Sequence, residues 1–127
     1  MLGHEVFQYA LWRLVADLER GESINAGVLL FCRRRSFLAA RVHVDAAKLS
    51  ALAPELDPRT VNDHLDGLVR VAAGDPGAGE LAQAPQSERF HWLVAPASTI
   101  VQPGPVHTGL CDDPAALLDR LFARLVL

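Results

Sequence analysis

Apolar and polar residues alternate through much of the first third of the chain, which predicts an antiparallel sheet. Residues 5–18 fit either a strand or a helix, because their apolar positions satisfy both spacings. The turn-like composition of 19–23 and the apolar, β-compatible run 24–32 favour a strand, since the two segments then form a hairpin. Residues 33–36 reverse the chain into the strictly alternating segment 37–44. We therefore expect a three-stranded antiparallel meander.

Two Asp-Pro pairs predict the starts of helices in the second half of the chain. Asp57-Pro58 and Asp113-Pro114 each place a capping carboxylate before a proline at the first helical position. An apolar stripe follows each pair, and Gly74 ends the first helix. The stripes are expected to lie on the sheet, and they consist of Val61, Leu65, Leu68, Val69 and Ala72 in the first helix and Leu117, Leu118, Leu121, Phe122 and Leu125 in the second.

The segments between these helices have weaker signals. Residues 45–52 predict a short helix, 75–86 a loop, and 87–95 the start of a helical turn. Residues 99–102 are a candidate fourth strand that the Pro-Gly-Pro break at 103–105 ends. The predicted fold class is α+β, a small antiparallel sheet (a three-stranded N-terminal meander plus the candidate fourth strand) packed against two to four helices.

The composition supports a single domain over 1–127. Half of the 127 residues are hydrophobic, enough for a core that needs no disulfide or metal. The formal net charge of −3 argues against a general nucleic-acid binder. Lys48 is the only lysine among the 12 basic residues. No apolar run approaches the ~20 residues of a membrane helix. Aromatic residues are few, and Trp92 is expected to anchor the core rather than to stack on a ligand.

Cysteine and histidine spacing predicts neither a metal site nor a redox site. Cys32, in an apolar run, and Cys111, assigned to a loop ahead of the last helix, are lone thiols, which favours a reducing, cytoplasmic location. The five histidines lie on different elements without the i,i+4 spacing of a helical metal site. No GxSxG, HExxH or P-loop signature is present. We therefore expect no metal, no cofactor and no catalytic residue.

The first hairpin is one candidate contact surface. Gly27 within a strand predicts a bulge or a close backbone approach. Glu22 and Asn25 either hold the turn or form a polar rim that faces a ligand or partner. The basic tip of the hairpin either caps a sheet edge or binds a phosphate or an acidic partner. It consists of Arg33, Arg34 and Arg35.

The second candidate surface is the Pro- and Gly-rich segment 87–114. In one interpretation, the polar side chains of this segment only form hydrogen bonds with its own buried polar groups. In the other, its guanidinium, hydroxyl and imidazole groups bind an anion. A phosphate held by Arg89, Ser98 and Thr99 is one arrangement, with His91 or His107 as acid or base because an imidazole titrates near neutral pH. The candidate contacts here are Arg89, His91, Ser98, Thr99, His107 and Thr108.

Three stretches carry a resemblance to a known family: YALWRLVADLERGESINAGVLLFC (9–32), LAPELDP (52–58) and SERFHWLVAPASTIVQPGPVHTGL (87–110). They resemble a bacterial family catalogued as domain of unknown function 3037. The resemblance implies a small stand-alone cytosolic domain, often encoded beside a kinase of the HipA-like class. It implies no catalytic residue.

Two hypotheses of function follow. The first is a non-catalytic accessory or protein-interaction domain, with a HipA-like Ser/Thr kinase as the partner that the resemblance implies. The alternative is a small ligand-binding domain or enzyme that acts on a phosphorylated or carboxylated molecule through residues 89–108. Convergence of Arg89, His91 and His107 in one pocket would favour the alternative. Nucleic-acid binding through the arginine tip is a third interpretation that the net charge disfavours.

Overall fold

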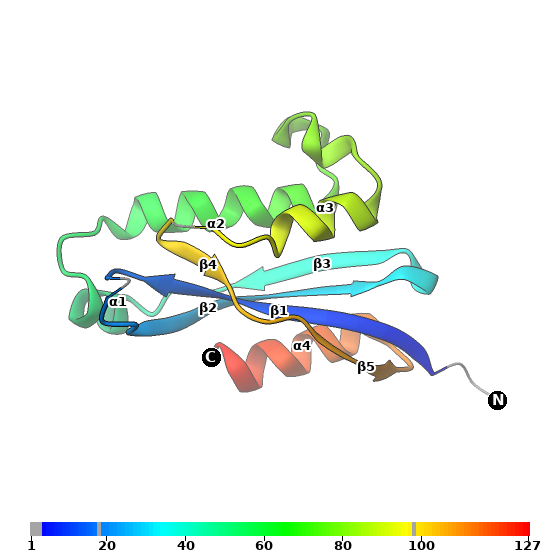
Figure 1. The fold of residues 1–127 in the computed structure, drawn as a ribbon, viewed down its shortest axis with the longest axis horizontal. Helices are drawn as coiled ribbons and strands as arrows, with labels where there is room; N and C mark the ends of the chain where they lie inside the picture. The colour runs from blue at the N-terminus through cyan, green and yellow to red at the C-terminus, as the bar shows by residue number, and fades with distance from the viewer. Residues whose placement is uncertain (1–3, 18, 98) are drawn as a thin grey trace.

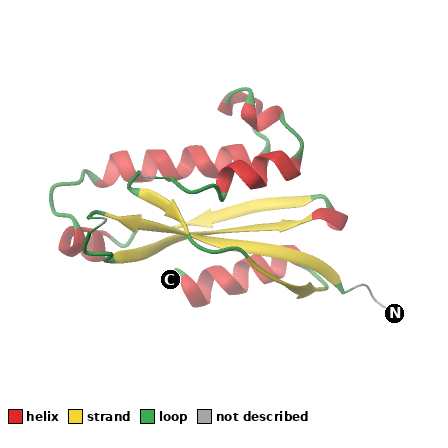
Figure 2. Ribbon diagram, viewed as in Figure 1, coloured by secondary structure: helices red, strands yellow, loops and turns green. Residues whose placement is uncertain are grey.

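The computed structural model describes residues 4–17, 19–97 and 99–127, and it places one antiparallel sheet between two layers of helix (Figure 1). Helices α2 and α3 cover one face of the sheet, and α4 covers the other (Figure 2). The strands are β1 (Glu5–Val15), β2 (Ser23–Cys32), β3 (Phe37–Val42), β4 (Val101–Pro103) and β5 (His107–Cys111). The helices are α1 (Ala46–Leu52), α2 (Pro58–Ala73), α3 (Gln86–Leu93) and α4 (Pro114–Leu125).

The predicted α+β class and the three-stranded meander are confirmed, and the sheet is larger than expected. Its order is β3-β2-β1, and β4 and β5 both pair with the far edge of β1. The candidate fourth strand is β4, with Pro103 as its last residue. The expectation that residues 107–111 belong to an irregular loop was wrong, because they form β5. The 75–86 loop contains two short 3-10 turns, and β3 ends at Val42.

Strand β2 divides the interior into two hydrophobic cores. Its residues from Ala26 to Cys32 are buried on both faces, because helices cover each side of the sheet. The core under α1–α3 contains Trp12, whose indole N–H donates to the Leu93 carbonyl at 3.1 Å. The core under α4 contains Phe7 and both cysteines. Hydrophobic packing against helices on both faces therefore stabilises the sheet.

The helix starts are built from the caps that the sequence predicts. The carboxylate of Asp57 accepts the backbone N–H of Arg59, and that of Asp113 accepts the N–H of Ala116. Asp45 caps α1 in the same way, and the backbone N–H of Lys48 lowers the pKa of its carboxyl group. These bonds satisfy N–H groups that the first turn of a helix leaves unpaired.

Gly27 lies next to a bulge in its own strand, β2, where Ala26 is the extra residue, as the sequence indicates. The pairing register shifts between Trp12, which lies opposite Gly27, and Arg13, which lies opposite Asn25. A Cβ atom on Gly27 would stand 2.9 Å from Cγ1 of Val42 and 3.0 Å from Cε3 of Trp12. The glycine thus allows Trp12 to lie directly against the backbone of β2.

We expect Gly27→Ala to lower the free energy of unfolding by about 1–3 kcal/mol, because Val42 and Trp12 must both move to admit the methyl group. Urea unfolding followed by circular dichroism measures the change. Gly67→Ala is the matched control, since a Cβ there meets nothing within 4 Å and alanine favours the helix. Equal stabilities for the two variants would contradict the close approach.

Candidate functional site

The polar residues of the first hairpin make local structural contacts. Glu22 pairs with Arg20 in the exposed turn, where the carboxylate also raises the pKa of the guanidinium group. Asn25 donates from Nδ2 to the Leu125 carbonyl at 3.0 Å. It therefore ties β2 to the end of α4, a long-range contact that the local sequence does not indicate.

The arginine tip forms a 3-10 turn whose position is fixed from several sides. Ser36 adopts the left-handed conformation with φ 49°, and its N–H donates to the Arg33 carbonyl at 3.0 Å. Gln86, at the start of α3, donates from Nε2 to the Ser36 carbonyl at 2.8 Å. Arg35 donates to the Asp112 carbonyl at 2.6 Å. The turn is thus attached to α3 and to the segment after β5.

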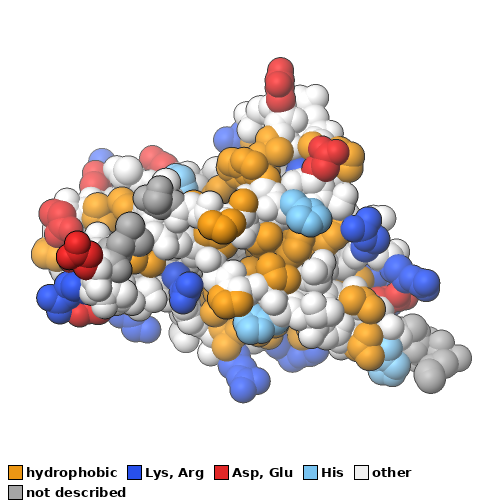
Figure 3. Space-filling view, in the orientation of Figure 1, with side chains coloured by type: hydrophobic (Ala, Val, Ile, Leu, Met, Phe, Trp, Pro, Cys, Tyr) orange, Lys and Arg blue, Asp and Glu red, His pale blue; other side chains and the backbone are white. Residues whose placement is uncertain are grey.

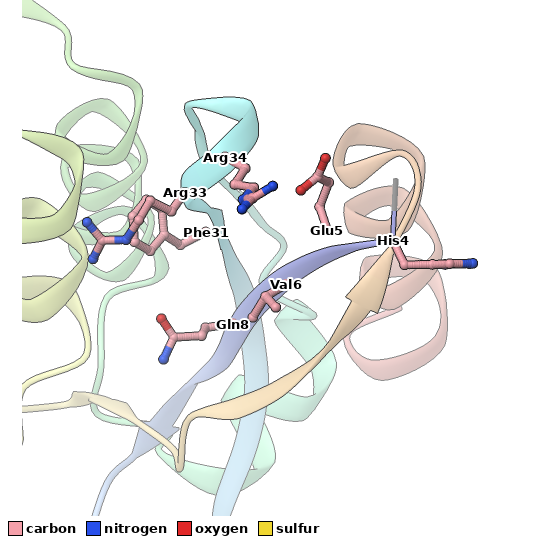
Figure 4. Close-up of a pocket in the computed structure, with 7 residues that line it drawn as sticks. All are labelled: His4, Glu5, Val6, Gln8, Phe31, Arg33 and Arg34. Carbon is pink, nitrogen blue, oxygen red and sulfur yellow. The ribbon is translucent and has the colours of Figure 1, made fainter. Parts of the chain in front are cut away.

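Arg33 and Arg34 border a pocket of about 470 Å³ at this end of the sheet, which we call the Arg-tip pocket. Figure 4 shows Arg34 and Glu5 on one side of it, Gln8 on another, and His4 directed away. The guanidinium group of Arg33 lies 5.6 Å from the ring centroid of Phe31, within cation–π range. The pocket is lined by His4, Glu5, Val6, Gln8, Phe31, Arg33 and Arg34.

Arg89 is a buried structural residue. It lies in α3, its exposed fraction is 9%, and its Nη1 donates to the Ala84 carbonyl. Nη2 contacts the Ala72 carbonyl near the end of α2 at 3.4 Å. The guanidinium group therefore connects the end of α2 with the segment that precedes α3. Its Nε atom is buried without a hydrogen-bond partner among the described atoms.

The other predicted anion-binding residues have separate contacts. His91 Nδ1 lies 2.8 Å from the Ser87 carbonyl, one turn earlier in α3. The ring of His107 stacks on that of Tyr9 with centroids 5.0 Å apart. Tyr9 belongs with the α4 face of the sheet, whereas α3 covers the opposite face.

Thr99 and Thr108 are also apart from Arg89. Thr99 Oγ1 donates to the Val101 carbonyl at 2.8 Å, which fixes the start of β4. Thr108 lies opposite Gln8 on β5 and is exposed. Ser98 lies outside the described residues. The side chains of Arg89, His91 and His107 therefore have different partners and lie at different places in the fold.

A hollow that the sequence did not indicate runs between α2 and β4, and we call it the α2–β4 groove. It consists of two adjoining pockets of about 370 and 260 Å³ that share His64, Thr99 and Val101. Glu55 and Asp57 lie at one end, and Trp92 at the other. The remaining lining residues are Leu56, Thr60, Val61, Ile100, Trp12, Leu68, Leu93, Ala95, Pro96, Ala97 and Pro103.

The expectation that Trp92 anchors the core was wrong, because its exposed fraction is 53%. Helix α3 buries Arg89, Phe90 and Leu93. Trp92 stands about 200° from Phe90 around the helix, so it turns away from that face. The i,i+3 spacing of Phe90 and Leu93 was the sequence signal that would have identified the buried face of α3 and placed Trp92 outside it. Figure 3 shows hydrophobic side chains exposed over this region.

The two thiols lie in the core under α4. Cys32 and Cys111 are both free and buried, which corrects the placement of Cys111 in a loop. Burial raises the pKa of the Cys111 thiol, and the neighbouring Cys32 raises it further. A protonated, buried thiol is a poor nucleophile.

The described residues contain neither a group of side chains suited to a metal ion nor a helix suited to span a membrane. Across residues 4–17, 19–97 and 99–127, no three His, Cys, Asp or Glu side chains are grouped to hold a metal ion. None of the helices in the described part of the chain has the length and apolar character that crossing a bilayer requires.

The fold and its surface define a small three-layer α+β domain with an apolar groove and a basic pocket at separate places. The chain belongs to the family described as protein of unknown function (DUF3037), whose sequence model matches residues 9–126. Neither a search of curated proteins nor a search of solved structures found a match.

Proposed function

We propose that the protein is a non-catalytic, cytosolic accessory domain that binds another protein through the α2–β4 groove. The exposed indole of Trp92 beside this apolar hollow is the observation that carries the proposal. Tryptophan is among the residues that contribute most to protein–protein binding when a partner covers them. For the partner we propose a Ser/Thr kinase of the HipA-like class, which the family resemblance implies.

The shape of the groove favours an apolar segment with a basic end. Asp57, Thr60, His64 and Leu68 line it along one side of α2, a length of roughly 16 Å at the helical rise. That length matches about three turns of a partner helix lying in the groove. Glu55 and Asp57 supply negative charge at one end, so a Lys or Arg of the partner would complement it.

Coexpression of a HipA-like Ser/Thr kinase with this chain, followed by size-exclusion chromatography, tests the proposal. We expect one shared peak for the unaltered chain. Trp92→Ala is expected to weaken binding by at least about 2 kcal/mol, roughly thirtyfold, because truncation removes the exposed indole that the partner would cover.

Leu127→Ala is the matched control, since Leu127 is also an exposed apolar residue but lies beyond α4. It is expected to leave the shared peak unchanged. Two separate peaks at micromolar concentration would reject the kinase as partner. A shared peak that survives Trp92→Ala would move the interface away from the groove.

A further inference from the structure

We propose that the Arg-tip pocket is a second docking site, and that its occupant is an acidic peptide segment carrying an apolar side chain between carboxylates. The site lies at the β2–β3 end of the sheet, apart from the α2–β4 groove, and shares no lining residue with it. The proposal does not depend on the kinase partnership.

The charge of the pocket is available for a ligand. Arg35 is engaged by Asp112 and lies 3.9 Å from Glu5. Arg33 and Arg34, in contrast, make no ion pair with any described carboxylate, and both are exposed. The two guanidinium groups point away from each other (Figure 4), so each can pair with a separate carboxylate of one peptide.

The two arginines are also held in place before any ligand arrives. The 3-10 turn is attached through Ser36 to Gln86 and through Arg35 to Asp112. Arg33 is further positioned over the ring of Phe31. A site on a fixed turn loses less conformational entropy on binding than one on a loose loop.

An apolar surface lies beside this charge. Val6 and Leu110 are directly opposite each other on β1 and β5, with exposed fractions of 56% and 63%. The largely buried ring of Phe31 lies behind this surface and contributes little exposed area to the pocket wall. Exposed apolar pairs of this kind are typical of interaction surfaces. The combination calls for a ligand with an apolar group near its negative charges.

The same features disfavour a nucleic acid as the occupant. Glu5 lines the pocket, and the chain as a whole carries a net charge of −3, so a long polyanion would be repelled beyond the tip. Phe31 is buried and offers no free ring face for stacking bases. A short segment with few carboxylates meets only the basic part of the surface.

A phage library of random octapeptides, panned on the immobilised full chain, tests this inference. The unaltered chain is expected to enrich peptides with two or more Asp or Glu residues beside an apolar residue. The R33E/R34E variant is expected not to enrich them. In fluorescence anisotropy, a labelled enriched peptide should bind R33E/R34E at least about tenfold more weakly, and added NaCl should weaken its binding to the unaltered chain.

R59E/R120E is the matched control, because it makes the same charge change at exposed residues of α2 and α4 outside the pocket. It should bind the peptide normally. R33Q/R34Q replaces R33E/R34E if charge reversal disturbs folding, as circular dichroism would show. No enrichment, enrichment of peptides without acidic residues, or equal binding by the two double variants would overturn the proposal. So would tighter binding of a labelled 12-nucleotide single strand through the same arginines.

Discussion

Replacing Trp12 with alanine is expected to lower the free energy of unfolding by about 3–5 kcal/mol, a larger loss than for Gly27→Ala or Arg89→Ala. The side chain is 1% exposed and lies against Gly27, and its N–H donates to the Leu93 carbonyl. Alanine would leave a cavity between β1 and α3 and an acceptor without its donor. For a domain whose total stability is of order 5–15 kcal/mol, this is a large fraction.

Urea unfolding followed by circular dichroism measures the effect of Trp12→Ala. Trp12→Phe retains most of the volume but not the N–H, and we expect it to cost about 1–3 kcal/mol. Trp92→Ala is the exposed counterpart and should change stability by less than about 1 kcal/mol. A loss below 1 kcal/mol for Trp12→Ala would show that this residue does not anchor the core under α2 and α3.

Arg89→Ala is expected to destabilise the protein by about 2–3 kcal/mol, because hydrogen bonds from a buried charged group are among the strong ones. The variant removes the donors to the carbonyls of Ala84 and Ala72 and loosens the attachment of α3 to α2. The expected sign separates a structural arginine from a ligand-binding one, since removing an unsatisfied site residue tends to stabilise a protein.

Thermal and urea unfolding of Arg89→Ala measure this difference. Arg59→Ala is the control, because Arg59 is exposed near the start of α2 and its side chain makes no ion pair among the described residues. It should change the free energy of unfolding by less than about 0.5 kcal/mol. An Arg89→Ala variant as stable as the unaltered protein would contradict a structural role and support Arg89 as a ligand contact.

Local signals placed most of the elements correctly. Asp57 and Asp113 cap helices beside their prolines, and Gly74 ends α2 with φ 74°. Each of these signals depends on neighbours within a few residues. The close approach at Gly27 was also predictable, because a glycine within a strand often marks a place where another group packs directly against the backbone.

The features that the sequence did not predict depend on contacts between residues far apart in the chain. Strand β5 is five residues long and forms only because β1 offers an edge about a hundred residues earlier in the chain. The burial of Arg89 depends on the carbonyl of Ala72. In the candidate site, the arginine tip was predicted, but Val6 and Phe31 reach the same pocket from other strands.

The break between β4 and β5 has a consequence for the solubility of the folded chain. Both strands pair with the same edge of β1, and Pro103 and Pro105 lie where one continuous edge strand would otherwise run. The Gly104 N–H still donates to the Leu11 carbonyl at 2.7 Å, so the segment stays attached. Proline has no N–H to offer to a further strand. This edge of the sheet therefore cannot template a continuous ladder with another molecule, which removes one of the two edges of the sheet as a site for strand addition.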